Sequence, residues 1–206
     1  MSSARLEPFP HVVLDGRWDP ELLERVREEF PHPQDGRWIR YENDREVKLH
    51  GDENCWGPAT RQLLGEFRDL GEELAETFDV PQMSMETVGG GLHLIPPGGK
   101  LDVHVDFNRS PETGLYRRLN LLCFLNPGWE DPGGRLELHG ESDGGPVQLA
   151  YSPDFNRTVV FESSDRSWHG HPVPARRWRL SAAAYFFSPE PPLGYLEDHS
   201  TVWRDA

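Results

Sequence analysis

The chain has 206 residues, of which 36% are hydrophobic, and a formal net charge of −14. This length suits one domain with a sizeable core, while the mean hydropathy of −0.67 leaves no segment apolar enough to cross a membrane. The acidity argues against nucleic acid or an anionic membrane as the main partner. Two cysteines are too few for a disulfide framework, and no signal-peptide pattern is visible. We therefore expect a reduced, cytoplasmic protein, and its oligomeric state is unknown.

The N-terminal part of the chain, residues 1–82, is predicted to be a helical flank. Residues 11–14 form an apolar run that suits an edge strand. The range 19–30 opens with an Asp-Pro pair, which is typical of an N-cap followed by proline in the first turn. Its apolar residues recur at helical spacing. Apolar residues in 58–78 also recur every three or four positions, so a second, continuous helix is predicted there, packed against the outside of a sheet.

Residues 36–56 lie between these two helices and show no clear period. The segment is polar with embedded aromatic side chains, among them Trp38 and Tyr41. Long irregular loops often bind ligands or act as lids, but a solvated connection has the same composition. We predict an irregular segment here and leave open whether it is a lid.

After residue 82 the chain changes to short apolar runs separated by turns. Strands are predicted over 91–95, 101–107, 118–125, 135–139, 147–151, 158–161, 169–173 and 178–187. Because no helix is predicted between them, the pattern indicates an antiparallel sandwich or barrel. This core is expected to span 83–190 and to be followed by an acidic tail over 191–206, all within a single domain.

A His-x-Asp pair lies in the second of these predicted strands. Residues two apart on a strand share a face, so His104 and Asp106 can bind one ion. A third ligand has to come from elsewhere, and His169 or His171 offers it. Their spacing cannot separate these two, but Pro172 follows His171 and bends its strand, so we favour His169. Two His and one carboxylate are the ligands of non-haem Fe(II) oxygenases.

An Fe(II) site of this kind needs a co-substrate that supplies two electrons. A 2-oxo acid can chelate the metal, and its distal carboxylate then needs a cation, for which the parallel donors of Arg are suited. Arg179 lies on the last predicted strand, and Ser181 and Tyr185 share its face. On an earlier strand, Asn120 is an inward polar residue that needs a partner, which the 2-oxo acid or a water would supply.

The order of these features resembles the prolyl-4-hydroxylase-like branch of the Fe(II)/2-oxoglutarate-dependent dioxygenase superfamily. The resemblance covers nearly half of the chain and rests on HVDFN (104–108), RRLNLLCFLN (117–126), GGRLEL (133–138), FNRTVVFESS (155–164), HGHPVP (169–174) and RLSAAAYFF (179–187). It implies a mainly β fold, a double-stranded β-helix of the jelly-roll or cupin-like kind, with flanking N-terminal α-helices.

The resemblance also implies the cofactors, Fe(II) and 2-oxoglutarate, with ascorbate as an optional reductant. The implied Fe(II) ligands are His104, Asp106 and His169. The expected 2-oxoglutarate-binding residues are Arg179, Ser181 and Asn120. Phe124 stands where prolyl hydroxylases often have a Tyr that hydrogen-bonds the co-substrate, so Ser181 is expected to donate that bond instead.

The predicted function follows from these expectations. The chain is expected to use O2 to hydroxylate an unactivated C–H bond of a small molecule, or of an amino-acid or peptidyl substrate, and to release succinate and CO2. The predicted substrate contacts are Trp38, Tyr41, His93, Arg109, Arg117, His171 and Tyr185. Two alternatives remain. A cupin-type metal-dependent isomerase or hydrolase would share the metal ligands without needing Arg179, and a non-catalytic ligand sensor would bind without turnover.

Overall fold

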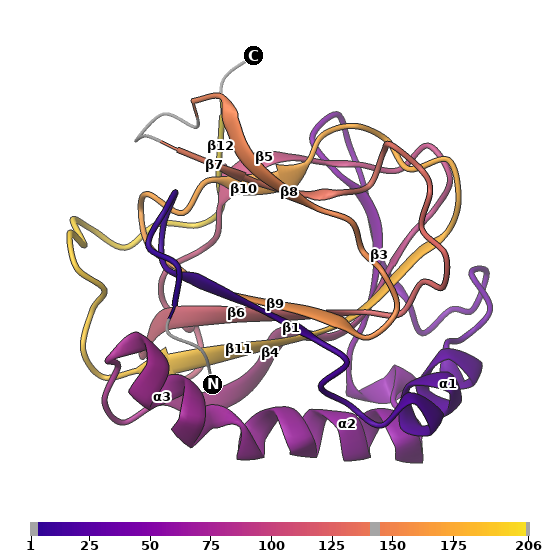
Figure 1. The fold of residues 1–206 in the computed structure, drawn as a ribbon, viewed down its shortest axis with the longest axis horizontal. Helices are drawn as coiled ribbons and strands as arrows, with labels where there is room; N and C mark the ends of the chain where they lie inside the picture. The colour runs from indigo at the N-terminus through magenta and orange to yellow at the C-terminus, as the bar shows by residue number, and fades with distance from the viewer. Residues whose placement is uncertain (1–3, 141–144, 205–206) are drawn as a thin grey trace.

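Two β-sheets face each other in the computed structural model of the protein, which describes residues 4–140 and 145–204 (Figure 1). The larger sheet contains β1 (His11–Asp15), β2 (Ile39–Glu42), β3 (Val47–Gly51), β4 (Ser84–Ile95), β6 (Tyr116–Phe124), β9 (Arg157–Glu162) and β11 (Arg179–Ser188). Their order across the sheet is β1-β9-β6-β11-β4-β3-β2. The smaller sheet contains β5 (Leu101–Val105), β7 (Leu136–His139), β8 (Val147–Tyr151), β10 (His169–His171) and β12 (Val202–Trp203). Their order is β12-β5-β10-β7-β8.

The paired strands in both sheets run antiparallel. The predicted fold class, a mainly β double-stranded β-helix with flanking N-terminal helices, is confirmed. The eight strands predicted after residue 82 correspond to β4 to β11, and the predicted edge strand over 11–14 is β1, at one end of the larger sheet.

Alternation along the strands of the larger sheet, interrupted at register shifts on β11, separates an apolar outer face from a partly polar inner face. On β6, Leu119, Leu121 and Cys123 belong to the main hydrophobic core, on the side of the helices. Asn120 and Leu122, between them, line a cavity between the two sheets. Every second side chain in this part of β6 therefore packs in the core, and the side chains between them face the interior of the β-helix.

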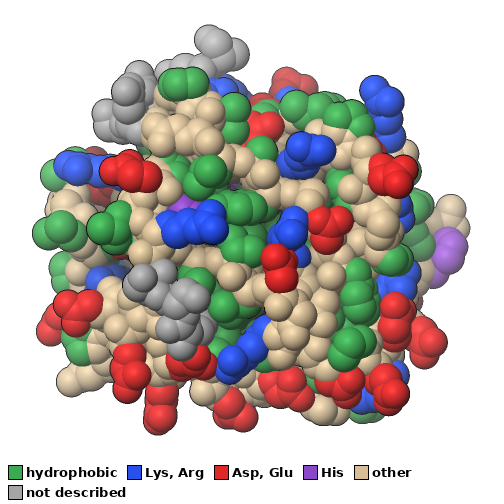
Figure 2. Space-filling view, viewed as in Figure 1, with side chains coloured by type: hydrophobic (Ala, Val, Ile, Leu, Met, Phe, Trp, Pro, Cys, Tyr) green, Lys and Arg blue, Asp and Glu red, His purple; other side chains and the backbone are tan. Residues whose placement is uncertain are grey.

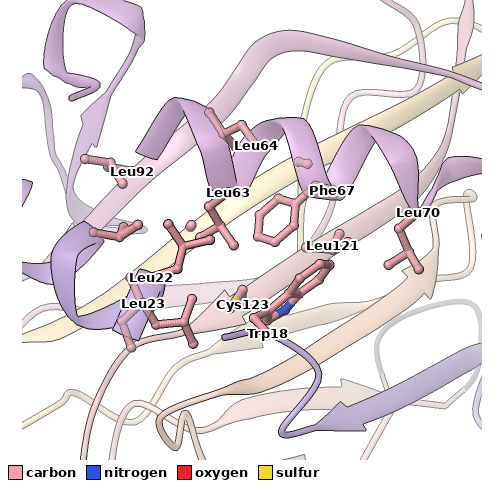
Figure 3. Close-up of a cluster of buried hydrophobic side chains, with 14 of the residues drawn as sticks. Trp18, Leu22, Leu23, Leu63, Leu64, Phe67, Leu70, Leu92, Leu121 and Cys123 are labelled. Carbon is pink, nitrogen blue, oxygen red and sulfur yellow. The ribbon is translucent and has the colours of Figure 1, made fainter. Parts of the chain in front are cut away.

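Three helices cover the outer face of the larger sheet (Figure 1): α1 (Pro20–Glu29), α2 (Pro58–Asp69) and α3 (Gly71–Phe78). Figure 3 shows how Leu22 of α1 and Phe67 of α2 point toward Leu121 of the sheet, with Trp18 beside them. As predicted, Asp19 caps α1, because its carboxylate accepts a hydrogen bond from the Glu21 amide. These contacts fix the larger sheet from behind.

The helix predicted over 58–78 is interrupted. It divides into α2 and α3 at Leu70, and Gly71 is the first residue of α3. A Cβ at Gly71 would lie 3.2 Å from the Phe186 ring, so a larger residue there would require that ring to shift by a few tenths of an ångström. Glu29 at the end of α1 caps α2, since its carboxylate accepts hydrogen bonds from the amides of Ala59 and Thr60 at 2.8 Å each.

Two segments without a predicted strand pattern extend the sheets. Within residues 36–56, β2 and β3 form a hairpin whose second strand pairs with β4, so the expectation of an irregular segment is wrong. The segment joins the larger sheet because Leu49 pairs with Leu94 of β4 and is buried in the hydrophobic core. The supposed tail over 191–206 includes β12, which pairs with β5 and sets Trp203 opposite His104.

The surface is consistent with the acidic composition. Acidic side chains gather along the edge of Figure 2 where the helices lie in Figure 1. Within the part of the chain that the structure describes, no helix is both long and apolar enough to span a bilayer.

Candidate metal and co-substrate site

His104, Asp106 and His169 meet in the space between the sheets. The pairing of β5 with β10 places His169 directly opposite His104, with ring centroids 4.4 Å apart. The Asp106 carboxylate lies 3.5 Å from Nε2 of His104 and 3.4 Å from Nε2 of His169. One ligand atom from each residue lies within 4.8 Å of the others, so this group could hold a metal ion. The two nitrogens and one carboxylate suit Fe(II).

The backbone orients both imidazoles toward this common point. Nδ1 of His104 lies 2.8 Å from the Asp102 carbonyl, and Nδ1 of His169 lies 2.8 Å from the Ser167 carbonyl. A carbonyl oxygen only accepts, so each Nδ1 donates and each Nε2 keeps its lone pair for an ion. Burial, followed by the neighbouring His169, lowers the pKa of His104, which favours the neutral form that binds metals.

The Asp106 carboxylate has two further partners on β6. Oδ2 accepts a hydrogen bond from the Asn120 amide at 2.7 Å and is paired with the Arg117 guanidinium at 3.1 Å. Burial alone would raise the pKa of Asp106, but Arg117 and the neighbouring His169 hold it well below its usual range. The carboxylate is therefore ionised and ready to bind a cation.

Arg179 lies in a narrow inner cavity that extends from the three candidate ligands between the sheets. Its Nε donates to the Gly134 carbonyl at 2.8 Å, and its guanidinium lies 4.9 Å from the centre of the Phe124 ring. Burial lowers its pKa to about 9, so it is still charged at neutral pH. Among the described residues it has no carboxylate partner, which leaves it free to bind an anion. Ser181 lines the same cavity.

His171 also lines the inner cavity, and its Nδ1 is buried without a hydrogen-bond partner among the described residues. Burial, followed by the charge of Arg179, holds the pKa of His171 well below its ordinary value. A buried polar atom and a buried unpaired cation are both costly unless a ligand satisfies them. The inner cavity therefore fits a small molecule with a carboxylate, such as a 2-oxo acid.

A second, outer cavity of about 390 Å³ shares His104 and Asp106 with the inner one. Its remaining lining residues are Tyr41, Glu46, Lys48, His50, Gly89, His93, Leu101, Phe107, Arg117, Tyr185, Ser200, Thr201 and Trp203. Lys48 is paired with Glu46 at 2.9 Å and lies 4.7 Å from the Tyr41 ring centre. The Trp203 ring packs 5.0 Å from the His104 ring. The candidate ligands thus lie where two cavities meet.

The structure brings most of the predicted residues to these cavities, but not all. Trp38 is buried in the hydrophobic core and donates its indole N–H to the His32 carbonyl. Arg109 lies at the surface, paired with Asp198 at 2.7 Å. Neither residue lines the inner or the outer cavity, so the structure does not bring these two to the site. Asn120 lines the inner cavity, where its Oδ1 accepts from Arg117 and its amide N–H donates to Asp106, and its contact with 2-oxoglutarate stays a prediction.

At the outer cavity, sequence reasoning missed Trp203 and did not single out Lys48 within the 38–48 stretch. Lys48 lies on β3, whose alternation is hidden in a polar segment, although Lys48 and His50 two positions later could have indicated a strand face. Trp203 reaches the site through a two-residue strand that pairs with a distant part of the chain. A local pattern could not have indicated that pairing.

Comparison with known proteins agrees with this geometry. Residues 90–187, nearly half of the chain, match the 2OG-Fe(II) oxygenase superfamily. A prolyl-4-hydroxylase from Pseudomonas putida is similar at a TM-score of 0.67 and 21% identity, over 86% of this chain and 91% of that one. A prolyl hydroxylase from Trichoplax adhaerens, in complex with a peptide fragment of hypoxia inducible factor, is similar at 0.65 and 18%, over 86% and 83%.

A viral collagen prolyl hydroxylase from Paramecium bursaria Chlorella virus-1, in complex with 2-oxoglutarate, is similar at a TM-score of 0.60 and 11% identity, over 86% of this chain and 96% of that one. These likenesses show the fold. Comparison with curated proteins gives no match.

The family match over residues 90–187, together with a fold like that of the prolyl hydroxylases, supports a 2OG-Fe(II) oxygenase. The chain is a 2-oxoglutarate-dependent dioxygenase, and its cofactors are Fe(II) and 2-oxoglutarate. A substrate and O2 are its partners. The family match favours this activity over the cupin-type isomerase or hydrolase and over the non-catalytic sensor.

Proposed function

We propose that the chain, as a single domain, hydroxylates an unactivated C–H bond of a small molecule, with release of succinate and CO2. In this proposal His104, Asp106 and His169 hold Fe(II), and Arg179 with Ser181 holds 2-oxoglutarate. One observation carries the proposal. The three candidate ligands line the inner cavity, which reaches Arg179, and two of them, His104 and Asp106, also line the outer cavity, which opens beside Trp203.

Each group in the inner cavity has a distinct part in holding the co-substrate. The Arg179 guanidinium binds the distal carboxylate through charge-assisted hydrogen bonds, and the Ser181 hydroxyl donates a further bond. Leu122, Leu136 and Phe161 supply an apolar wall that excludes water and strengthens these interactions. Bound iron supplies the oxidative chemistry, while the protein supplies orientation and a dry pocket.

The walls of the outer cavity support a small substrate over a segment of polypeptide. The β2–β3 hairpin forms one wall through Tyr41 and Lys48, and residues 200–203 form another. Arg45, in the turn of the hairpin, donates to the Arg204 carbonyl at 2.8 Å and so joins the two walls. A bridged cavity of about 390 Å³ is in the size range of small-molecule sites.

The test is succinate release from 2-oxoglutarate in the presence of Fe(II) and O2. Free amino acids and other compact carboxylates are compared with proline-containing peptides of ten residues. The proposal expects release above the substrate-free rate with a compact molecule and no increase with the peptides. Stimulation by the peptides alone would replace the small substrate with a polypeptide, and absence of any succinate would contradict the assigned cofactor site.

A further inference from the structure

Arg117 is the largest of the fully buried side chains in the described part of the protein, at 2% exposure. Burying a guanidinium away from water costs several kcal/mol unless it is paired and hydrogen-bonded. Such a residue needs a specific reason to face the interior. Its surroundings are the candidate metal site rather than the hydrophobic core.

A β-bulge turns Arg117 toward that site. Strict alternation on β6 would put Arg117 and Asn120 on opposite faces of the sheet. The register with β11 shifts between Phe186 and Phe187, which pair with Leu119 and Arg117, so Arg118 has no partner in that strand. The extra residue reverses the alternation, and Arg117 therefore shares the inner face with Asn120. Bulges next to active sites commonly re-aim a side chain in this way.

Arg117, Asn120 and Asp106 form a closed hydrogen-bonded triangle. Nε of Arg117 donates to Oδ1 of Asn120 at 2.7 Å, and the Asn120 amide donates to Oδ2 of Asp106 at 2.7 Å. Arg117 completes the triangle with its 3.1 Å ion pair to the same Oδ2. Its guanidinium carbon lies 3.6 Å from the ring centre of Tyr185 and 4.6 Å from that of Phe107, which restricts its rotamer.

The triangle treats the two carboxylate oxygens of Asp106 differently. Oδ2 accepts from Asn120, is paired with Arg117 at 3.1 Å and lies 3.4 Å from Nε2 of His169, whereas Oδ1 lies 3.5 Å from Nε2 of His104. We propose that Arg117, aimed by the bulge and braced by Asn120, is a positioning residue that fixes the Asp106 carboxylate beside the two imidazoles, in the orientation that would hold the metal. This inference rests on the proposed function, since it concerns the same Fe(II) site.

A substrate contact is the competing role for Arg117, because it also lines the outer cavity. The two roles predict different defects. A positioning residue changes metal affinity, while a substrate contact changes the KM of the substrate and leaves metal affinity unchanged. Charge alone predicts a third result, since removing a cation beside a metal ion tightens metal binding. Orientation of a ligand by its hydrogen-bond partner is worth about 10–100-fold in metal affinity.

The experiment is an anaerobic Co(II) titration of the full chain, followed by the visible absorption of the bound ion. Arg117→Gln is expected to weaken Co(II) binding about 10–100-fold and to change the spectrum. Arg117→Lys keeps the positive charge but loses the paired N–H donors of the guanidinium. Its Co(II) affinity should lie between those of Arg117→Gln and the wild type. Arg118→Gln is the control, because it removes the neighbouring guanidinium, which donates to the Glu190 carbonyl away from the site, and should bind like the wild type.

Circular dichroism and thermal unfolding show whether each variant folds. If Arg117→Gln does not fold, Asn120→Ala decides, since it removes one tie to Asp106 and one to Arg117 and should weaken Co(II) binding about tenfold. Wild-type or tighter Co(II) binding in a folded Arg117→Gln protein overturns the positioning role. Failure of the wild type itself to bind Co(II) would instead contradict the proposed metal site, so the two failures are distinguishable.

Discussion

The two sheets supply different chemistry to the space between them. The smaller sheet carries His104 and His169, with Asp106 just beyond the end of β5. The larger sheet carries the cations that these groups and the co-substrate need, Arg117 on β6 and Arg179 on β11. The candidate metal ligands therefore face their charged partners across the interior of the β-helix.

The two sheets differ in what packs behind them, and this explains why the imidazoles lie on one sheet and the arginines on the other. The larger sheet is covered by helices and a continuous apolar core, so it can hold buried guanidinium groups in fixed positions (Figure 3). The strands of the smaller sheet are shorter, and the backbone carbonyls of Asp102 and Ser167 orient its two imidazoles. Variants on the smaller sheet should therefore affect metal binding first, and most variants on the larger sheet should affect what binds beside the metal.

Removing a ligand from the smaller sheet is expected to have the largest effect. His169→Ala should lower Fe(II) affinity more than about 100-fold, because a direct ligand contributes more than its hydrogen-bond partners do. His171→Ala, on the same strand, should keep Fe(II) binding and weaken only 2-oxoglutarate. Both affinities can be measured by anaerobic titration. Equal loss of Fe(II) binding in the two variants would contradict the choice of His169.

On the larger sheet, Arg179→Ala is expected to raise the KM for 2-oxoglutarate about 100-fold, the effect of removing one partner of a desolvated charge pair. Fe(II) affinity should stay near the wild-type value. Arg179→Lys should raise this KM less, since it keeps the positive charge although it loses the paired N–H donors of the guanidinium. Arg176→Ala is the control, because it removes an exposed arginine three residues before Arg179. A KM unchanged in Arg179→Ala would show that the carboxylate binds elsewhere.

Trp203 tests the contribution of β12 to the smaller sheet. Its ring lies 5.0 Å from that of His104, so binding of Co(II) should quench part of the tryptophan emission. Trp203→Phe should remove that part of the change and leave Co(II) affinity within about threefold of wild type. Trp178→Phe, at a tryptophan that is 41% exposed, should retain the quenching. Retained quenching in Trp203→Phe would place β12 away from the metal.

The smallest expected effect concerns pH. Burial, then His50 and Lys48, hold the pKa of His93 well below its ordinary 6.5, and Arg179 adds to this. The folded protein then binds fewer protons than the unfolded chain, so stability is highest above pH 6.5 and decreases as pH falls below it. His93→Gln should reduce this decrease in urea unfolding between pH 7.5 and 5.5. Exposed His32→Gln should leave the decrease unchanged, and an unaltered slope in His93→Gln would contradict the account.

The strand pattern and the candidate metal ligands could be predicted because each depends on local order. His104 and Asp106 are two apart at the end of one strand, and the apolar runs after residue 82 are separated by clear turns. The pairing of β3 with β4 and of β12 with β5 could not be predicted, since these partner strands are distant in the chain. Arg117 could not be placed either, because a bulge reverses the face that alternation assigns to it.

The most direct test of the account is anaerobic addition of Fe(II) and then 2-oxoglutarate to the metal-free protein, followed in the visible region. The account predicts a charge-transfer band between iron and the 2-oxo acid. The band should be absent in His169→Ala, present in His171→Ala, and should need far more 2-oxoglutarate in Arg179→Ala. A wild-type protein that binds Fe(II) but develops no band would contradict the assignment of both cavities.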